Sequence, residues 1–442
     1  MKTFRMGGVH PEENKISNDA AIEVMPVGKQ MVVLMNQHLG APATPVVQKG
    51  DKVKVGQLIG EAQTFMCANV HSPVSGTVLK VDGCKDAFGL TKPAVYINVE
   101  GDEWMETIDR TPDIKRECTL EPKEIVAKLK EMGIVGLGGA TFPAHIKYSI
   151  PEGKKAEYLI VNAAECEPYL TSDYRVMMEH AEEVCIGVSL LRRALGVPNA
   201  YIGIESNKPL AIQKMTETAR SFEGIVVEPL KVKYPQGAEK QLINAVTGRR
   251  VPSGKLPIDV GCVVSNVGTC FSVYEAVQKN KPLIENILTV TGKELPSQHN
   301  YVVRIGTTYN EIIRHSIGEL PSSTGKVVSG GTMMGKAVVN LEAPTVKGNA
   351  SVLVIGEKEA RRAQESNCIR CGKCMHACPM GLEPYLFSLL VKNGRTEESK
   401  THNILDCIEC GCCYFSCPAN KPLLDEIRLG KNRVRAMMAA RK

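Results

Sequence analysis

Two cysteine runs near the C-terminal end restrict the fold and chemistry of this chain more than any other feature. Each has the spacing C-x2-C-x2-C-x3-C followed by proline. In this spacing three cysteines hold one 4Fe-4S cube and the fourth ligates the cube of the other run. We therefore predict two 4Fe-4S clusters in a C-terminal domain of residues 358–442. The predicted ligands are Cys368, Cys371, Cys374 and Cys378 in the first run, and Cys407, Cys410, Cys413 and Cys417 in the second.

Other uses of cysteine fit these runs less well. Zinc ribbons pair C-x2-C units but do not need a third and a fourth cysteine followed by proline. Disulfides need an oxidising compartment. Proline directly after the fourth cysteine suits the first position of a helix. The runs thus favour a bacterial ferredoxin-like domain, in which Cys412 is an additional thiol and not a ligand.

Length and composition exclude several classes of protein. A chain of 442 residues is too long for one hydrophobic core and predicts three or four domains. The N-terminus lacks the apolar region of a secretory signal, and no apolar stretch approaches the 18 residues of a transmembrane helix. The net charge of +6 comes without a basic, aromatic-interleaved stripe, so we expect no nucleic-acid partner. Clusters without export indicate a reducing cytoplasm.

The first module, residues 1–115, is predicted to be a β barrel-sandwich. Short β-rich runs alternate with glycine turns between residues 20 and 100, which is typical of small all-β folds. The phrases GDKVKVGQLIG and VHSPVSGTV resemble biotinyl and lipoyl barrels. The stretch 61–69 between them contains no lysine to carry a prosthetic group. We therefore do not expect a swinging-arm carrier.

From residue 121 the pattern changes to alternating helices and strands. The glycines Gly136, Gly138 and Gly139 expose backbone N–H groups that suit a bound phosphate. An ordinary glycine-rich turn without a ligand is equally consistent with this pattern. A strand at 158–161 ends in Asn162, Glu165 and Glu167. Ligands bind at such strand ends in open α/β sheets. The sequence predicts a helix over 174–195, and further strands at 200–204, 225–227 and 259–264.

Four phrases of this central region carry a resemblance to a known family. GLGGATFP, NAAECEP, YPQGAEKQL and SNVGT, in this order, resemble the FMN- and NADH-binding subunit of respiratory complex I. Together with GGVHPEENK and SGGTMMGK, they are similar to the C subunits of Rnf electron transport complexes. The resemblance implies a multidomain α/β chain, with a complex-I-51K-like flavin domain at residues 116–275 and a soluble-ligand-binding β-grasp domain at 276–357.

The same resemblance implies roles for individual residues. The glycine loop and the strand ends would bind FMN and NADH, with Phe142 stacking on NADH and Lys147 near the FMN phosphate. Glu167 and Glu239 would line the nicotinamide site as the catalytic carboxylates. Ala164 and Ala238 depart from the complex I pattern, which has acids there. The implied cofactor-binding set is Gly136, Gly138, Gly139, Ala140, Phe142, Lys147, Asn162, Glu165, Asn266 and Thr269.

Electron counting links these parts. NADH delivers two electrons as a hydride, whereas iron-sulfur clusters accept one at a time, so a flavin is needed between them. The resemblance implies a peripheral NADH dehydrogenase-type subunit on the cytoplasmic side of the inner membrane. Its complex would couple NADH and, indirectly, ferredoxin to Na+ or H+ translocation, with flow possible in either direction. The implied partners are the Rnf membrane and iron-sulfur subunits, especially the ferredoxin-like B subunit.

Three other functional assignments are also consistent with the sequence. Cobalamin reductases of diol-degrading microcompartments share these modules. The chain could also be a non-enzymatic subunit that holds clusters but no flavin and passes electrons between its partners. The central fold could also be inherited without its cofactor, as in a related quinone-reductase subunit family, although that family lacks the two cysteine runs.

Overall fold

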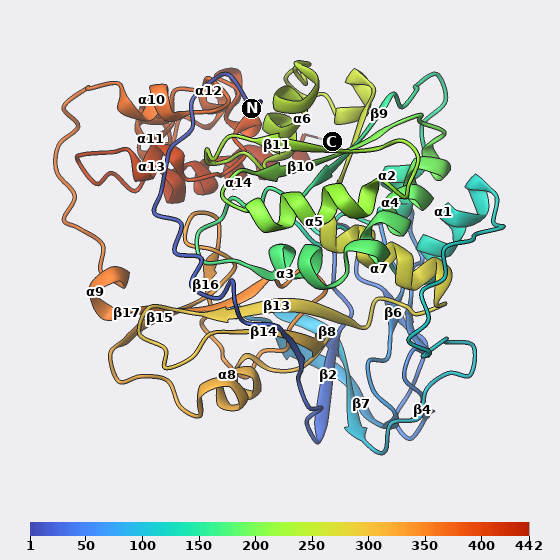
Figure 1. Ribbon diagram of the computed structural model, residues 1–442. Coiled ribbons are helices and arrows are strands. Elements are labelled where there is room, and N and C mark those ends of the chain that lie inside the picture. Colours follow the sequence, from blue (N-terminus) through green and yellow to red (C-terminus); the bar gives the residue numbers. More distant parts are fainter. Residues whose placement is uncertain (442) are drawn as a thin grey trace.

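The computed structural model describes residues 1–441, so the last residue of the predicted fourth module lies outside it. Within residues 1–441, the chain forms four sheets and a helical C-terminal region. In Figure 1 the N-terminal sandwich lies at the lower right, the central α/β module above it, and the cluster region at the upper left, with both termini near the top. No helix in residues 1–441 is both long and apolar enough to cross a membrane.

The N-terminal module contains two small sheets that face one another. Four antiparallel strands have the order β2-β8-β7-β4, and three have the order β3-β5-β6. Alternate residues of the strands point inward, so that Val33, Ile59, Val95 and Ile97 are fully buried. The bounds are β2 (Gln30–Leu34), β3 (Thr44–Pro45), β4 (Lys52–Val53), β5 (Leu58–Glu61), β6 (Val70–His71), β7 (Gly76–Lys85) and β8 (Thr91–Val99).

The first 24 residues lie outside this sandwich. Their strand β1 (Ile22–Val24) pairs in parallel with β14 (His299–Arg304) of another sheet. Upstream, Lys2 and Val9 form bridges to Leu230 and Tyr234 of the central module. The segment appears in Figure 1 as the blue trace that descends from the cluster region to β14. The predicted module 1–115 therefore begins with a segment that packs against other modules.

The central module is a parallel sheet with the order β11-β10-β9-β12, flanked by helices. Its helix α1 begins with a capping box between Glu121 and Glu124. The predicted helix over 174–195 is two helices, because His180 leaves the helical conformation between them. The bounds are α1 (Pro122–Glu131), α2 (Ala144–Tyr148), β9 (Tyr158–Asn162), α3 (Ser172–Glu179), α4 (Ala181–Leu195), β10 (Ala200–Glu205), α5 (Pro209–Ala219), β11 (Ile225–Leu230), α6 (Glu239–Thr247), η1 (Pro257–Val260), β12 (Cys262–Asn266) and α7 (Val267–Gln278).

The third module is a mixed sheet with the order β1-β14-β13-β17-β15-β16, with helix α8 packed on it. The Thr308 hydroxyl and the Glu311 carboxylate form a capping box that starts α8. Lys347 comes from a loop of this module, and its ammonium donates to the carbonyls of Asn69 and Gly133, both at 2.7 Å. This lysine therefore links three modules. The remaining bounds are β13 (Glu285–Thr291), α8 (Tyr309–Ile317), β15 (Thr324–Ser329), β16 (Lys336–Ala337) and β17 (Ser351–Gly356).

The C-terminal module repeats one backbone path at the two cysteine runs. Arg370 and Glu409 hold the equivalent position with φ of 54° and 58°, and Gly372 and Gly411 follow with 75° and 78°. A short helix starts after each glycine, at α10 (Lys373–Ala377) and α13 (Cys412–Phe415). The other elements are α9 (Glu357–Ala360), α11 (Pro384–Lys392), α12 (Thr396–Thr401), η2 (Ile404–Asp406) and α14 (Leu423–Ala439). The long α14 packs on α11 and encloses the second run.

Candidate functional site

The predicted site lies where the strand order of the central sheet reverses. From β9 the chain passes outward to β10 and β11, and then returns to β12 on the other side of β9. Asn162 and Asn266, the last residues of β9 and β12, lie directly opposite each other in the register. In open α/β sheets the carboxyl ends of the strands at such a reversal form the ligand-binding crevice.

The glycine loop 136–142 projects over this crevice. The Gly136 N–H donates to the Phe142 carbonyl at 2.9 Å, which closes the loop. A Cβ at Gly138 would lie 2.9 Å from the Asn266 side chain, so only glycine fits there, whereas Gly139 has no neighbour within 4 Å. Ala140 is exposed. The loop thus combines a close approach to α7 with an open glycine face, and such a cradle fits a phosphate-bearing cofactor.

Asn266 and Thr269 hold this loop against the start of α7. The Asn266 side chain caps the helix by accepting from the Thr269 N–H at 3.2 Å. The Thr269 hydroxyl accepts from the Leu137 N–H at 3.0 Å. Asn266 also donates to Asp173 at 2.7 Å. Burial, and next the Glu165 carboxylate, raise the pKa of Asp173 to about 7. This acid was not a predicted site residue, and it is a titratable group of the site.

Asn162 and Glu165 organise the loop that follows β9. Asn162 donates to the Gly237 carbonyl at 2.8 Å and accepts from the Ala164 N–H at 3.2 Å. The Glu165 carboxylate accepts from the N–H groups of Asp173 at 2.7 Å and Tyr174 at 3.3 Å, at the start of α3. An acid at this position is favoured by the helix dipole. Both predicted ligands are therefore also structural parts of the crevice.

Two lysines that were not predicted as site residues fix the same loop from behind. Lys15 donates to the carbonyls of Glu165, Glu167 and Leu170 at 2.7, 2.8 and 2.7 Å. Lys208, which is 3% exposed, donates to the Ala164 carbonyl at 2.7 Å. Burial lowers the pKa of Lys15 to about 8. Lys15 lies within GGVHPEENK, but only the folded chain shows that this phrase reaches the loop after β9.

The two predicted catalytic carboxylates have different surroundings. Glu167 accepts from the N–H groups of Met333 at 3.1 Å and Met334 at 2.8 Å, and contacts the Tyr234 hydroxyl at 3.3 Å. Burial raises its pKa. A Cβ at Gly331 would lie 2.1 Å from Glu167 Oε2, so the turn 330–335 can approach the carboxylate only because residue 331 is glycine. Glu167 thus joins the central module to the β-grasp module.

Glu239 lies at the surface beside Lys147. Its side chain is 43% exposed and its carboxylate is 3.4 Å from the Lys147 ammonium. Lys147 also donates to the Val264 carbonyl of β12 at 2.9 Å. Phe142 is half-buried at the end of the glycine loop. The Glu239–Lys147 pair is open to solvent and can meet a ligand. Glu167 already accepts from two backbone N–H groups and contacts the Tyr234 hydroxyl, whose proton is nearer to the Cys410 carbonyl.

Four of the predicted cluster ligands surround one cavity. Cys378 of the first run and Cys407, Cys410 and Cys413 of the second line it, together with apolar residues such as Phe387 and Ile427. Burial raises the pKa of the Cys407 thiol to about 11, whereas the neighbouring Cys412 thiol lowers the pKa of Cys410. A set of three cysteines from one run and the fourth from the other fits a 4Fe-4S cube.

The other four predicted ligands lie nearer the surface. Cys368 and Cys371 are exposed, and Cys374 and Cys417 are half-buried. Burial, and more weakly the nearby Cys417 thiol, raise the pKa of Cys374. Within residues 1–441, no three His, Cys, Asp or Glu side chains are close enough to hold a single metal ion. Cys412 is fully buried, and its thiol contacts the Tyr234 carbonyl at 3.9 Å.

Tyr234 connects this cavity to the loop after β9. Its hydroxyl donates to the Cys410 carbonyl at 2.8 Å and contacts Glu167. Val9, Cys166 and Met333 pack in the same cluster with Cys410 and Cys412. The crevice at the end of β9 and the cavity of the second cysteine run are therefore joined by one tyrosine side chain.

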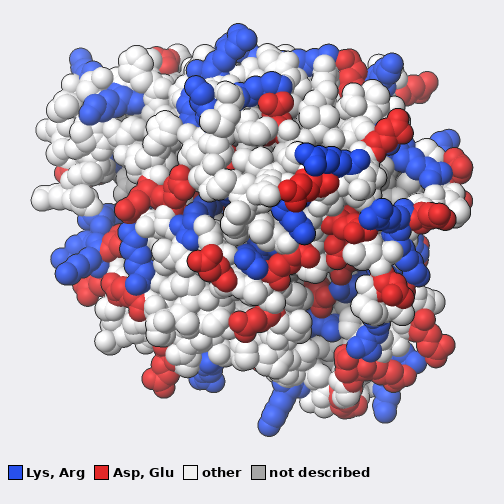
Figure 2. Space-filling view, viewed as in Figure 1, with Lys and Arg blue, Asp and Glu red and all other residues white. Residues whose placement is uncertain are grey.

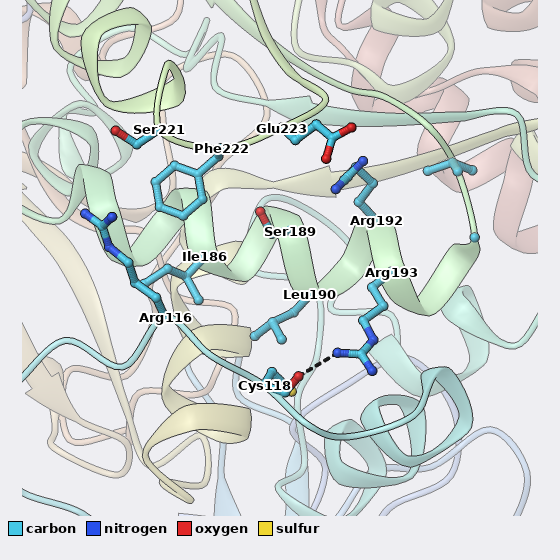
Figure 3. A pocket seen from close by; sticks show the side chains of 12 residues that line it. Arg116, Cys118, Ile186, Ser189, Leu190, Arg192, Arg193, Ser221, Phe222 and Glu223 are labelled. Atoms are coloured by element: carbon cyan, nitrogen blue, oxygen red, sulfur yellow. Dashed lines mark hydrogen bonds between the residues drawn. The ribbon is translucent and has the colours of Figure 1, made fainter.

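A separate surface hollow of about 610 Å³ lies on the outer face of α4. Figure 3 shows three arginines around it, with Arg193 donating to the Cys118 carbonyl. Arg116 and Arg192 are also bonded, to Glu182 and to the Pro198 carbonyl. No predicted site residue lines this hollow. On the face in Figure 2, basic and acidic side chains are interspersed.

Comparisons with known proteins agree with this arrangement. Residues 2–102 match the RnfC barrel sandwich hybrid domain, residues 129–275 the Nuo51 FMN-binding domain, and residues 361–418 the 4Fe-4S dicluster domain. The C subunit of the proton-translocating ferredoxin:NAD(+) oxidoreductase complex of Clostridium ljungdahlii is 46% identical, over 99% of this chain and 95% of the relative. The chain belongs to the RnfC family.

Other family members support the same assignment. The C subunit of the Na(+)-translocating ferredoxin:NAD(+) oxidoreductase complex of Acetobacterium woodii is 42% identical over 98% of this chain and 97% of its own. The C subunit of the Rhodobacter capsulatus ion-translocating oxidoreductase complex is 39% identical over 97% and 82%. An NAD+-reducing [NiFe]-hydrogenase structure shares the fold, with a TM-score of 0.50 and 17% identity over 72% of this chain and 66% of that chain. The predicted barrel-sandwich, complex-I-51K-like flavin and two-cluster ferredoxin-like folds are confirmed, as are the FMN and 4Fe-4S cofactors.

Proposed function

We propose that the chain is the NADH-oxidising, electron-input subunit of an ion-translocating Rnf complex. The observation that carries this proposal is the junction at Tyr234, which joins the crevice after β9 to the cavity of the second cysteine run. FMN, when bound, converts a two-electron hydride donor into a source of single electrons. A site of this kind next to a cluster site supports electron input from NADH.

The chain's own residues bind and orient the reactants in this proposal. The open face at Gly139 and the N-terminus of α7 receive the FMN phosphate, with Lys147 supplying positive charge. Lys15 and Lys208 hold the carbonyls of the loop after β9, which fixes the positions of Asn162 and Glu165. Preorganised contacts of this kind act without further rearrangement during the reaction.

The two cluster sites have a defined order in this proposal. The cavity of Cys378, Cys407, Cys410 and Cys413 is buried beside Tyr234, so a cluster held by these cysteines would be the nearer one to the flavin crevice and the first to accept electrons. The site of Cys368, Cys371, Cys374 and Cys417 includes two exposed cysteines and is the exit. Burial of the first cluster keeps water away from it, which is one of the factors that set cluster potentials.

The exit site is also the proposed contact with the other subunits. Ile369 and Phe415 are 70% and 52% exposed beside the cysteine runs, and Arg370 and Lys373 lie in the first run. An apolar surface with basic neighbours fits an acidic iron-sulfur partner such as the ferredoxin-like B subunit. We place the chain on the cytoplasmic side of the membrane. Its relatives belong to complexes that are named for proton and for Na+ translocation. We therefore assign the choice of the translocated ion to the whole complex and not to this subunit.

Anaerobic purification tests the proposal directly. The protein should retain FMN and about eight iron atoms per chain, and NADH should bleach both the flavin and the clusters. A Cys410→Ser variant should keep FMN reduction by NADH but lose reduction of the exit cluster. A protein without FMN, or with clusters that NADH does not reduce, would contradict the assignment.

A further inference from the structure

The N-terminal segment, residues 1–24, contacts three modules in sequence. Val9 and Tyr234 exchange two backbone hydrogen bonds, each of 2.9 Å. Lys15 holds the loop after β9, and Ile22–Val24 forms β1 on the β-grasp sheet. Between Lys2 and Val9 the segment also crosses the first cysteine run. A segment with this many partners fixes the relative positions of the flavin crevice and the cluster module.

The contact with the cysteine run is made by two glycines. The Gly8 N–H donates to the Ala377 carbonyl at 2.9 Å. A Cβ at Gly7 would lie 2.5 Å from both the carbonyl carbon and the oxygen of Cys378, and 2.7 Å from the nitrogen of Pro379. These are backbone atoms, which cannot swing away as the end of a side chain can. Any residue other than glycine at position 7 must therefore displace Cys378.

Cys378 is the predicted ligand of the buried cavity that comes from the first cysteine run. Cys407, Cys410 and Cys413 come from one continuous turn, whereas Cys378 reaches the cavity from the other run. Its backbone is held by the N-terminal segment on one side and by Gln241, which donates to the Pro379 carbonyl at 3.2 Å, on the other. The fourth corner of the site thus depends on contacts outside the cluster module.

We propose that Gly7 is a positioning residue for the buried 4Fe-4S cluster, because the close contact of its backbone with Cys378 sets that ligand in the cavity. This inference rests on the proposed function in one respect, namely that the cavity holds a cluster. It adds that the N-terminal phrase GGVHPEENK is part of the cluster site, although its residues lie more than 350 positions away in the chain.

A matched pair of variants separates this contact from backbone strain. Gly7 has a φ of 62°, and Gly254 has a φ of 66° but no atom within 4 Å of the position that a Cβ would take. Alanine at either position is destabilised by the left-handed backbone conformation, but of the two variants it is Gly7→Ala whose Cβ clashes with the backbone of Cys378. The readouts are iron per chain and the electron paramagnetic resonance spectrum of the dithionite-reduced protein. Cys378→Ser serves as the reference for a lost fourth ligand.

The expected result is a loss of about half of the iron and of one cluster signal in Gly7→Ala, as in Cys378→Ser, with FMN content unchanged. Gly254→Ala should keep the iron content of the natural protein. Equal iron in the two glycine variants would overturn the inference and leave the proposed function intact. A natural protein that binds no cluster after reconstitution would instead overturn the proposed function.

A second pair guards against a variant that does not fold. Gly8 and Gly50 share a φ of 93°, but Gly8 is surrounded by Phe4, Lys233 and Tyr234, and Gly50 has no neighbour within 4 Å. Gly8→Ala, whose Cβ would meet Phe4, Lys233 and Tyr234 first, should keep more iron than Gly7→Ala, and Gly50→Ala should keep the iron content of the natural protein. If Gly7→Ala and Gly8→Ala are both insoluble while both controls fold, the segment serves folding in general and the specific role of Gly7 is refuted.

Discussion

Replacing Glu167 with alanine should release the turn 330–335 from the loop that follows β9. The carboxylate accepts from the N–H groups of Met333 and Met334 at 3.1 and 2.8 Å. A hydrogen bond to a charged group contributes about 1.5–3 kcal/mol, and each 1.4 kcal/mol changes an equilibrium about tenfold. The two amides should therefore exchange about 10- to 100-fold faster with solvent deuterium in Glu167→Ala.

Hydrogen exchange of the peptide that covers residues 330–336 measures this effect, because local opening governs the exchange of protected amides. Glu239→Ala is the control, since that side chain is 43% exposed and its carboxylate pairs with Lys147. It should leave the exchange of the turn unchanged. Equal exchange rates in Glu167→Ala and the natural protein would refute the role given to this carboxylate. Full NADH oxidation by the same variant would remove Glu167 from the nicotinamide site.

Three further predictions concern the crevice and the module contacts. Gly139→Ala should change the unfolding free energy by less than about 1 kcal/mol, because nothing lies within 4 Å of the added Cβ. The affinity for FMN, measured by fluorescence, should fall at least about tenfold, and an undiminished affinity would place the cofactor elsewhere. Asn266→Ala should cost about 2–4 kcal/mol in urea unfolding, from the lost cap and the bond to buried Asp173, and an unchanged midpoint would contradict this. Burial lowers the pKa of Lys347 from 10.5 to about 7, so the folded state disfavours the charged form of this lysine. The stability that the neutral side chain contributes is fully present above pH 10.5, and it is lost as the pH falls through about 7. The melting temperature of the natural protein should thus rise relative to Lys347→Met between pH 7 and 10, and parallel curves would refute the argument.

The cluster chemistry could be predicted because ligand spacing is a local property. A 4Fe-4S site needs four thiolates, and a short turn supplies three of them at fixed intervals. The crossing of Cys378 to the second run follows from the same rule, and the structure brings these four cysteines to one cavity. The location of a ligand site at the strand ends, Asn162 and Asn266, could also be predicted, because parallel strands place their carboxyl ends at one edge of the sheet.

Contacts between distant segments could not be predicted in this way. Lys15 and Lys347 look like ordinary surface lysines in the sequence, yet both bury their ammonium groups against carbonyls of other modules. Burial of a charged end depends on which segments meet, and one sequence without its fold does not show this. The approach of Gly331 to Glu167 has the same origin. The carboxylate was selected as a nicotinamide contact, and its bonds to the turn 330–335 are visible only in the folded chain.

The break at His180 shows a different limit. The apolar pattern continues through residues 174–195, so periodicity alone predicts one helix. His180 has φ of −126°, which ends α3, and α4 starts anew with Glu182 and Glu183 in its first turn. The Glu179 carboxylate accepts from the Ile22 N–H at 3.0 Å at this point. The helix therefore divides where the N-terminal segment contacts the central module.

The order in which NADH reduces the flavin and the two clusters shows whether electrons enter at the crevice and leave at the exposed cysteines. Rapid mixing of the anaerobic holoprotein with NADH, followed by flavin absorbance and by freeze-quenched electron paramagnetic resonance, resolves the flavin and the two clusters separately. We expect the flavin to be reduced first, then the cluster of Cys378, Cys407, Cys410 and Cys413, and last the exposed cluster. Reduction of the exposed cluster before the buried one, or of either cluster in protein stripped of FMN, would contradict this expectation.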